Sequence, residues 1–428
     1  MNSRTFILKG NIIYSETSTA LSVTEQGFLI CCDGISQGVY SRIPEQFQSL
    51  PVIDNKDLLI IPGMTDLHIH APQYPFRALG MDMELLKWLE THTFPEESRY
   101  ADIDYAKSAY RIFTDALRKS ATTRAVIFGT IHPAATRLLM ELLETSGLKT
   151  YVGKVNMDQN CTDVLNEKTA DASLNATTEW LNDVAGTFRN TQPILTPRFA
   201  PTCSDALMRG LGELQRAYHL PVQSHLSENL SEIAWVNELF PWSSFYGDVY
   251  DRYGLFGRET KTVMAHCVYS CEEEIQRMKT NGVYIAHCPQ SNINLASGIA
   301  PARRYLEEGI PMGLGTDMAG GANLSMFRCM ADAIGASKLY WRLIDQEKKP
   351  LSMEEAFYLA TAGGGSFFGK TGSFRAGYEL DALVIDDSGI RTPKALTVKE
   401  RLERYIYLAE EGGRLVRKYT AGKEIDLS

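Results

Sequence analysis

The sequence predicts an α/β fold in which a (β/α)8 TIM-type barrel lies beside a small β-sandwich domain built from both chain ends. The length supports this fold, because 428 residues suit one barrel and a small companion domain. Between residues 63 and 370, apolar strand-like runs alternate with helical patterns, as they do in β/α units. Short apolar runs separated by turn residues occupy residues 1–62 and 371–428. We expect these two end segments to form the second domain.

The first expected strands lie in the N-terminal segment. Residues 6–8, 28–31 and 58–61 are apolar runs separated by Gly, Asn and Asp, a pattern typical of short strands joined by turns. A similar strand-like run returns at residues 378–386, near the other end of the chain. The recurrence of strand signals at both ends is the reason to expect one composite β domain.

The barrel itself should begin with the strand that leads into His68. Seven more apolar runs follow, and long helical patterns such as residues 105–119 lie between them. These runs are residues 124–128, 149–155, 193–198, 220–224, 260–265, 282–286 and 310–315. With the first strand they make eight, the number that closes a TIM-type barrel.

Composition and charge narrow the range of partners. The chain is 44% hydrophobic and 22% charged, which is typical of a globular enzyme. Its formal net charge of −9 opposes binding to nucleic acid and to anionic membrane surfaces. The densest basic run, residues 399–404, also contains Glu400 and Glu403, so a solvated helix face is the favoured interpretation. We expect no nucleic-acid partner.

Cysteine usage and hydropathy predict the compartment. Eight cysteines are scattered along the chain without a C-x-x-C pair, so neither a zinc knuckle nor a thioredoxin-like motif is indicated. Residues 1–10 are too polar for a signal peptide, and no apolar run reaches the roughly 18 residues of a membrane span. We therefore expect a cytoplasmic protein with reduced thiols and no membrane contact.

The most prominent motif is His68-x-His70, at the end of the first expected barrel strand. Side chains two residues apart on a strand point to the same face, and the C-terminal ends of barrel strands carry the chemistry of this fold. A single H-x-H pair nevertheless arises often by chance. Taken alone, it is better explained as two polar residues near a strand end than as a metal site.

Three further residues make a metal site the favoured interpretation of the H-x-H pair. His225, His266 and Asp317 each follow an expected strand in a different β/α unit, so they should meet the histidine pair at one mouth of the barrel. Imidazoles together with one carboxylate suit a borderline divalent cation that keeps an open position for water. We expect one such ion per chain, with Zn²⁺ as the first candidate and Fe²⁺ as the second.

A candidate acid/base residue, Glu228, lies three residues after His225. This offset places a carboxylate beside the metal without making it a ligand, which is the arrangement that a general acid/base requires. Alone, Glu228 would be interpreted as a surface glutamate at a helix start, where the helix dipole favours acids. The neighbouring metal residues favour the catalytic interpretation.

The remaining histidines carry weaker signals. His287 also ends an expected strand, and a role near the substrate and a structural role are equally supported for it and for His132. His92 and His219 fall in helical or connecting stretches, where structural or solvated roles are favoured.

Several segments together resemble a known enzyme family. They are residues 62–70, 71–74, 93–96, 197–204, 224–228, 266–267, 287–292, 313–321, 367–370 and 377–382. This set resembles the amidohydrolase superfamily and, within it, the guanine deaminases, over about residues 60–386. The H-x-H pair marks the superfamily, whereas the His-Ala-Pro-Gln and Arg-Phe segments narrow the resemblance to guanine.

The resemblance implies a role for each site residue. The implied ligands of a single metal ion, usually zinc, are His68, His70, His225 and Asp317. The residues implied to contact the purine are Gln73, Arg198, Phe199, His225, Glu228 and Asp317. The residues implied in catalysis are Glu228, Asp317 and His266, the last as a hydrogen-bond partner of the metal's water. The family also implies a homodimer.

The implied reaction is hydrolytic deamination of guanine at C2 by a metal-activated water, which gives xanthine and ammonia in purine catabolism or salvage. Glu228 would protonate the adjacent ring nitrogen and later the departing amine, while Asp317 takes the water's proton and His266 orients the water. Gln73 can donate and accept hydrogen bonds, whereas Arg198 only donates, so a base with the wrong pattern would leave buried groups unpaired.

Two alternatives remain open. One is a related amidohydrolase that deaminates another purine, a pterin, a triazine or cytosine, because a fold alone does not determine a substrate. The other is a catalytically silent barrel that serves as a binding or assembly protein. Such a barrel would be expected to lack metal ligands, yet the four expected ligands and Glu228 are all present.

Overall fold

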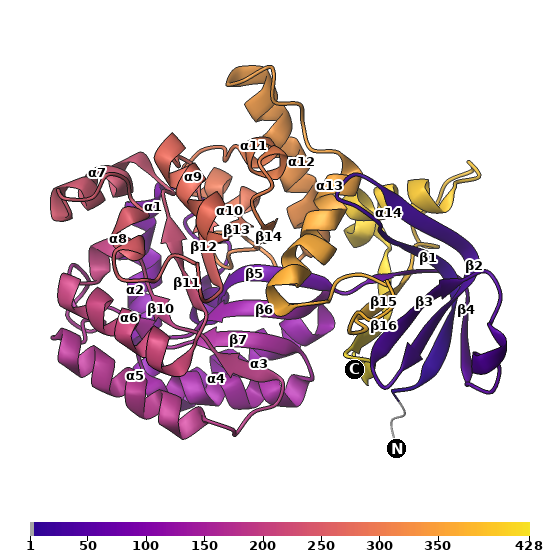
Figure 1. Ribbon diagram of the computed structural model, residues 1–428, viewed down its shortest axis with the longest axis horizontal. Coiled ribbons are helices and arrows are strands. Elements are labelled where there is room, and N and C mark those ends of the chain that lie inside the picture. The colour runs from indigo at the N-terminus through magenta and orange to yellow at the C-terminus, as the bar shows by residue number, and fades with distance from the viewer. Residues whose placement is uncertain (1–3) are drawn as a thin grey trace.

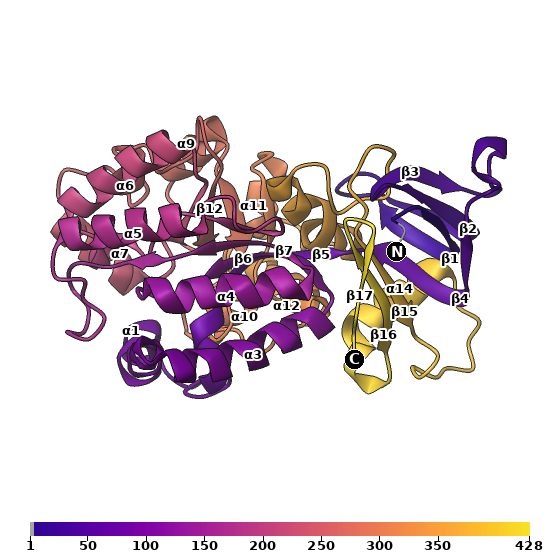
Figure 2. The same cartoon turned by 90° about the horizontal axis from the view of Figure 1, so that it is seen from below.

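Both ends of the chain contribute to one seven-stranded sheet, with strand order β17-β16-β15-β4-β1-β2-β3. The computed structural model describes residues 4–428, so the first three residues of the expected β domain lie outside it. The strands are β1 (Phe6–Ser15), β2 (Leu21–Cys32), β3 (Ile35–Tyr40), β4 (Val52–Pro62), β15 (Ala382–Asp386), β16 (Arg414–Thr420) and β17 (Lys423–Ile425). Antiparallel pairing of β4 with β15 joins the two ends, which lie side by side in both views (Figures 1 and 2).

The strand-like runs expected near the two ends all coincide with strands of this sheet. Strands β3, β16 and β17 and the helix α14 (Val398–Leu408) are additions that the apolar runs did not indicate. Since the seven strands are hydrogen-bonded into one sheet, the two-layer sandwich stays a prediction.

Eight parallel strands form the second part of the protein, in the order expected from the sequence. One sheet contains β5 (Met64–His70), β6 (Thr122–Phe128), β7 (Lys149–Gly153) and β9 (Thr191–Pro193). The other contains β11 (Val222–Leu226), β12 (Thr262–His266), β13 (Tyr284–His287) and β14 (Met312–Leu314). A parallel bridge between Leu195 and Val222 links the two sheets at one side, and β14 contacts β5 at the other. The α/β class is therefore confirmed.

Two short strands and a set of helices complete this part. The pair β8 (Val155–Asn156) and β10 (Thr196–Pro197) follows β7 and β9. The longer helices are α3 (Ile103–Lys119), α4 (Pro133–Ser146), α5 (Ala170–Val184), α6 (Asp205–Tyr218), α7 (Leu230–Leu239), α9 (Glu272–Asn281) and α12 (Met326–Leu343). The shorter ones are α1 (Leu85–Trp88), α2 (Phe94–Ser98), α8 (Asp248–Asp251), α10 (Pro289–Asn294), α11 (Ala302–Glu307) and α13 (Met353–Tyr358).

Side-chain caps explain where several helices begin. The Asp102 carboxylate accepts hydrogen bonds from the backbone N–H groups of Asp104 and Tyr105 at the start of α3. The Ser204 hydroxyl accepts from Leu207 N at the start of α6. Each cap satisfies N–H groups that have no partner inside the helix.

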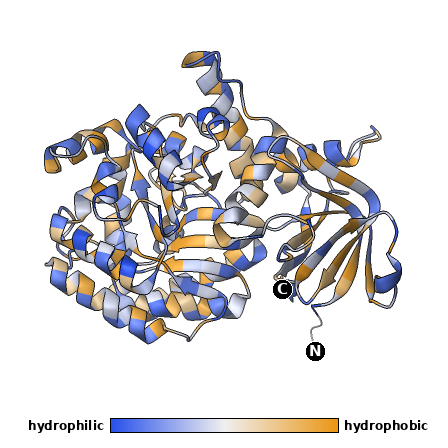
Figure 3. Ribbon diagram, viewed as in Figure 1, coloured by the Kyte–Doolittle hydropathy of each residue, from blue (hydrophilic) through white to orange (hydrophobic). Residues whose placement is uncertain are grey.

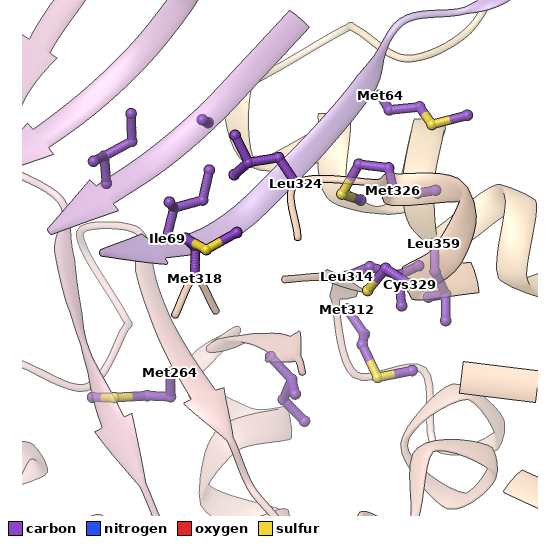
Figure 4. Close-up of a cluster of buried hydrophobic side chains, with 14 of the residues drawn as sticks. Met64, Ile69, Met264, Met312, Leu314, Met318, Leu324, Met326, Cys329 and Leu359 are labelled. Carbon is purple, nitrogen blue, oxygen red and sulfur yellow. The ribbon is translucent and has the colours of Figure 1, made fainter. Parts of the chain in front are cut away.

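The main core lies between the parallel strands and the helices around them. Figure 3 shows hydrophobic central strands, with hydrophilic stretches on the surrounding helices. Five of the labelled core side chains in Figure 4 are methionines, namely Met64, Met264, Met312, Met318 and Met326. All five are buried. Methionine fills irregular gaps because it is unbranched and flexible. Among residues 4–428, no helix is long and apolar enough to cross a membrane.

Candidate metal and purine site

The expected site residues meet at one end of the parallel strands. His68 and His70 lie at the end of β5, His225 lies near the end of β11, and His266 ends β12. Asp317 follows β14 by three residues. Because the strands run parallel, their C-terminal ends lie on the same side and bring these side chains together.

The polar atoms of these side chains are close enough to share one cation. The Nε2 atom of His70 lies 3.2 Å from Nε2 of His68 and 3.1 Å from Nε2 of His225. The Asp317 Oδ1 atom lies 3.1 Å from Nε2 of His68 and 3.4 Å from Nε2 of His70. The His266 Nε2 atom is farther away, 3.9 Å from Asp317 Oδ2. We call His68, His70, His225 and Asp317, which these shorter contacts link one to the next, the tight group; His266 lies just outside it, with its ligand atom still within 4.8 Å of those of His68 and Asp317.

Hydrogen bonds fix the orientation of two of these rings. The Nδ1 atom of His225 lies 2.5 Å from the carbonyl oxygen of Arg198, which can only accept, so Nδ1 carries the proton. The Nδ1 atom of His266 lies 2.9 Å from Oδ1 of Asn292 and is assigned in the same way. In both rings the Nε2 lone pair is left facing the site, as metal ligands and proton acceptors require.

The donor set fits a divalent metal ion. Burial lowers the pKa of His70 and His225 well below the ordinary value, so both imidazoles are neutral at physiological pH. Neutral imidazoles and a carboxylate are the ligands that zinc and ferrous iron bind. The ligand atoms of His68, His70 and His225, and likewise those of His68, His266 and Asp317, lie within 4.8 Å of one another, and of these residues only His225 is partly exposed.

A buried carboxyl group, Glu228, stands beside the metal residues. Burial raises its pKa to about 8, so it can both hold and release a proton near neutral pH. The Ser297 hydroxyl donates a 2.9 Å hydrogen bond to Oε1, and Oε2 lies 3.4 Å from Nε2 of His266. The backbone N–H of Glu228 donates to the buried carboxylate of Glu232 at 2.9 Å. These contacts hold the Glu228 carboxyl group in the cavity lining, beside His266.

A cavity opens from the metal residues. Its lining side chains are His70, Gln73, Leu85, Trp88, Leu89, Arg198, Phe199, His225, Glu228, Glu232, His266, Leu295 and Asp317. All six side chains expected to contact a purine line this cavity, namely Gln73, Arg198, Phe199, His225, Glu228 and Asp317. Apolar parts of the lining come from Leu85 and Trp88 in α1, from the next residue Leu89, and from Leu295. Apolar walls with a few converging polar groups are typical of small-molecule sites.

Other features of the site were not indicated by the sequence patterns. The Asp66 carboxylate is fully buried and accepts hydrogen bonds from the N–H and the hydroxyl of Thr316, beside Asp317. Asp66 lies two residues before His68 on the same strand, so the two-residue alternation could have indicated it. The Glu97 carboxylate binds both Gln73 and Arg198, and only its position next to a family-like segment could have indicated it.

The four remaining histidines lie outside the cavity lining. His287 ends β13 and is buried, and burial lowers its pKa to about 4. His132 precedes α4 at its N-cap position. His219 follows α6, and the ring of His92 stacks on Phe76 with centroids 6.3 Å apart. Their functional roles stay predictions.

The Ser297 contact leads to a testable expectation. Ser297→Ala removes the donor to Oε1 of a buried carboxylate, and loss of such a hydrogen bond should lower kcat by about 10-fold. KM should change little, because Ser297 is absent from the cavity lining. Steady-state kinetics of purified enzyme measure both constants. Ser337→Ala, another buried serine whose hydroxyl binds a helix carbonyl, is the matched control; equal kcat values for the two variants would contradict the expectation.

Comparison with known proteins agrees with this geometry. A family model described as "Amidohydrolase family" matches residues 59–413. The chain belongs to the amidohydrolase family. A guanine deaminase from Dictyostelium discoideum is 38% identical over 382 residues, which are 87% of this chain and 84% of the relative. One from Escherichia coli K12 is 34% identical over 421 residues, 94% and 93% of the two chains.

A solved amidohydrolase structure extends the comparison to three dimensions. The guanine deaminase from C. acetobutylicum, with guanine bound in its active site, aligns with a TM-score of 0.95 and 47% identity. The alignment covers 99% of this chain and 100% of that chain. The resemblance to guanine deaminases, first suggested by short segments, therefore extends over nearly the whole chain.

Proposed function

We propose that this protein is a guanine deaminase that hydrolyses guanine at C2 to give xanthine and ammonia. The observation that carries the proposal is a cavity whose lining joins two kinds of residue. It combines His70, His225, His266 and Asp317 with Gln73, Arg198 and Phe199. The likeness to a guanine-bound deaminase at 47% identity supports guanine as the substrate.

The metal would be held by the tight group of four side chains, His68, His70, His225 and Asp317. Zinc is the first candidate and ferrous iron the second, because imidazoles and one carboxylate suit both. When bound, the ion supplies a Lewis acid that lowers the pKa of water toward neutrality. The largely buried setting strengthens this effect, since charges interact more strongly away from solvent.

The protein's own groups would manage the protons. Glu228 can give a proton to the ring nitrogen next to C2 and later to the departing amine, since its pKa of about 8 lets it exist in both forms. His266 presents an Nε2 lone pair near both Glu228 and Asp317 and can orient a water by accepting its hydrogen. Asp317 has Oδ2 directed toward His266 and can share the proton that leaves the water.

Recognition of the base would fall to Gln73, Arg198 and Phe199. Gln73 and Arg198 are both buried in the cavity lining, and their N–H groups can donate to the carbonyl and ring-nitrogen acceptors of a purine. Phe199 is buried beside them, with its ring 6.5 Å from that of His225, and offers an apolar surface. A base with the wrong acceptor pattern would leave these donors unpaired, at a cost of about 1–3 kcal/mol for each group.

An ammonia-release assay over a panel of bases tests the proposal. We expect release from guanine, and not from adenine, cytosine or melamine, when the enzyme holds its metal. Treatment with a chelator should abolish release, and added Zn²⁺ should restore it. Metal analysis of the same samples should give one ion per chain. Release from adenine or cytosine without release from guanine would overturn the substrate assignment, and full activity in a metal-free sample would overturn the metal assignment.

Four further expectations complete the proposal. We propose that the eight parallel strands close into one TIM-type barrel spanning residues 63–370, with both chain ends forming a β-sandwich. The linkage of the two four-stranded sheets at both sides supports closure.

We also propose a homodimer, which light scattering of the purified protein tests, and a cytoplasmic location. Eight free cysteines are in keeping with a reducing compartment.

A further inference from the structure

A single carboxylate outside the cavity lining contacts two of the side chains expected to bind the purine, Gln73 and Arg198. Glu97 lies in α2 and is only 3% exposed. Its Oε1 atom accepts a 2.9 Å hydrogen bond from Nε2 of Gln73 and a 3.1 Å bond from Nη2 of Arg198. Its Oε2 atom accepts from Nη1 of Arg198. Glu97 does not line the cavity, whereas Gln73 and Arg198 do.

These contacts determine how Gln73 faces the base. Its Nε2 atom donates to Glu97, and its Oε1 atom accepts from the backbone N–H of Ala319 at 3.1 Å. The two contacts exclude the flipped amide, because a flip would set an N–H against an N–H and an oxygen against a carboxylate. One Nε2 hydrogen remains for the cavity. Glu97 thus keeps Gln73 as a hydrogen-bond donor toward the purine.

The same contacts determine the charge that the base meets. The Arg198 guanidinium is buried and forms a two-pronged ion pair with Glu97. A buried arginine without a partner would favour an anion, since a buried charge is costly unless it is paired. With Glu97 in place, the pair carries no net charge. The remaining N–H groups of Arg198 can then donate to a neutral acceptor.

We propose that Glu97 is a positioning residue that makes the cavity select neutral purines over anionic ones. The inference rests on the proposed function for the identity of the ligand class. Glu97 acts through Gln73 and Arg198, and it touches neither the base nor the reacting atoms. Loss of its charge should therefore weaken the binding of guanine and at the same time strengthen the binding of a purine anion.

The test compares Glu97→Gln with Glu96→Gln and the wild type. Glu96→Gln is the matched control, because it makes the same glutamate-to-glutamine change one residue away. The Glu96 carboxylate contacts Arg99 and Tyr105 instead of the cavity residues. KM and kcat for guanine are measured by ammonia release, and binding of urate, an anion at neutral pH, is measured by calorimetry. For E97Q we expect KM to rise about tenfold, kcat to change less, and urate to bind about fivefold more tightly.

The urate measurement separates a charge-balancing role from a merely structural one. A general loosening of the site would weaken both ligands, so unchanged or weaker urate binding in E97Q would overturn the proposal. Tighter urate binding in E96Q of the same size would overturn it as well. If E97Q does not fold, Glu97→Asp takes its place. This variant keeps the negative charge but shortens the side chain, so KM for guanine should rise while urate binding stays at the wild-type value. Tighter urate binding by E97D would overturn the proposal.

The experiment distinguishes a failure of the proposed guanine deamination from a failure of the proposed role of Glu97. If the wild-type enzyme does not release ammonia from guanine, the proposed function is wrong. The urate arms still report on Glu97, because calorimetry needs no turnover. If the wild type deaminates guanine and E97Q shows no gain in urate affinity, the inference about Glu97 is wrong and the proposed function stands.

Discussion

Replacement of Glu228 by glutamine should lower kcat for guanine by about 10³-fold, within the 10²–10⁴ range that general acid/base catalysis contributes. Glutamine has nearly the shape of glutamate and can still accept the hydrogen bond from Ser297. It cannot deliver a proton to the ring nitrogen or the departing amine. The chemical step should therefore fail while the architecture of the site persists.

The metal content of Glu228→Gln shows whether the fall in kcat comes from the missing proton donor or from a lost metal ion. Glu228 lies outside the tight group of His68, His70, His225 and Asp317, so Glu228→Gln should retain one ion per chain. Steady-state kinetics and metal analysis of the same preparation measure both quantities. Glu238→Gln is the control, because Glu238 is exposed near the end of α7, the helix that follows Glu228. Turnover close to the wild-type rate, or loss of the ion together with activity, would contradict the acid/base role.

The strand order and the meeting of the histidines with Asp317 are the features that the sequence predicted best. Both depend on local patterns, namely apolar runs that form buried strands and polar residues that follow them. Because parallel strands end on the same side, a pattern read strand by strand is enough to bring His225, His266 and Asp317 to the H-x-H pair. The eight expected runs all coincide with parallel strands for the same reason.

The supporting contacts could not be predicted in this way. Glu97 and Arg198 are 101 residues apart, and Ser297 and Glu228 are 69 apart. Glu97 and Ser297 lie in stretches that carry no strand pattern, so nothing local indicates which distant side chain they meet. Such pairs depend on how loops and short helices pack against the parallel strands. Strands β16 and β17 were missed because alternating polar residues weaken their apolar signal.

The largest effect on stability is expected where the parallel strands meet the seven-stranded sheet. Arg124 in β6 is buried, and its Nε donates to Oδ2 of Asp381 at 2.6 Å. Its Nη2 donates to Oδ1 of the same carboxylate at 3.1 Å and to Glu379 at 2.6 Å. Asp381 also accepts from Thr123 and from Ala421 N. One carboxylate therefore ties β6 to the C-terminal strands.

Arg124→Met should destabilise the fold strongly, since it leaves the buried Asp381 carboxylate without its cation. Breaking a buried pair from one side costs about 3–5 kcal/mol, which for 428 residues lowers the melting temperature by about 3–6 °C. Arg137→Met is the control, because Arg137 pairs with Glu141 and Asp183 while its side chain is 33% exposed.

Exposed pairs contribute about 0–1 kcal/mol, so the control should melt within about 1 °C of the wild type. Scanning calorimetry of the three proteins at one scan rate measures the difference. Equal melting temperatures for the two variants would show that the attraction between Arg124 and Asp381 only balances the cost of removing both groups from water. In that case the apolar contacts of β4, β15 and the neighbouring strands would have to hold the two parts of the protein together.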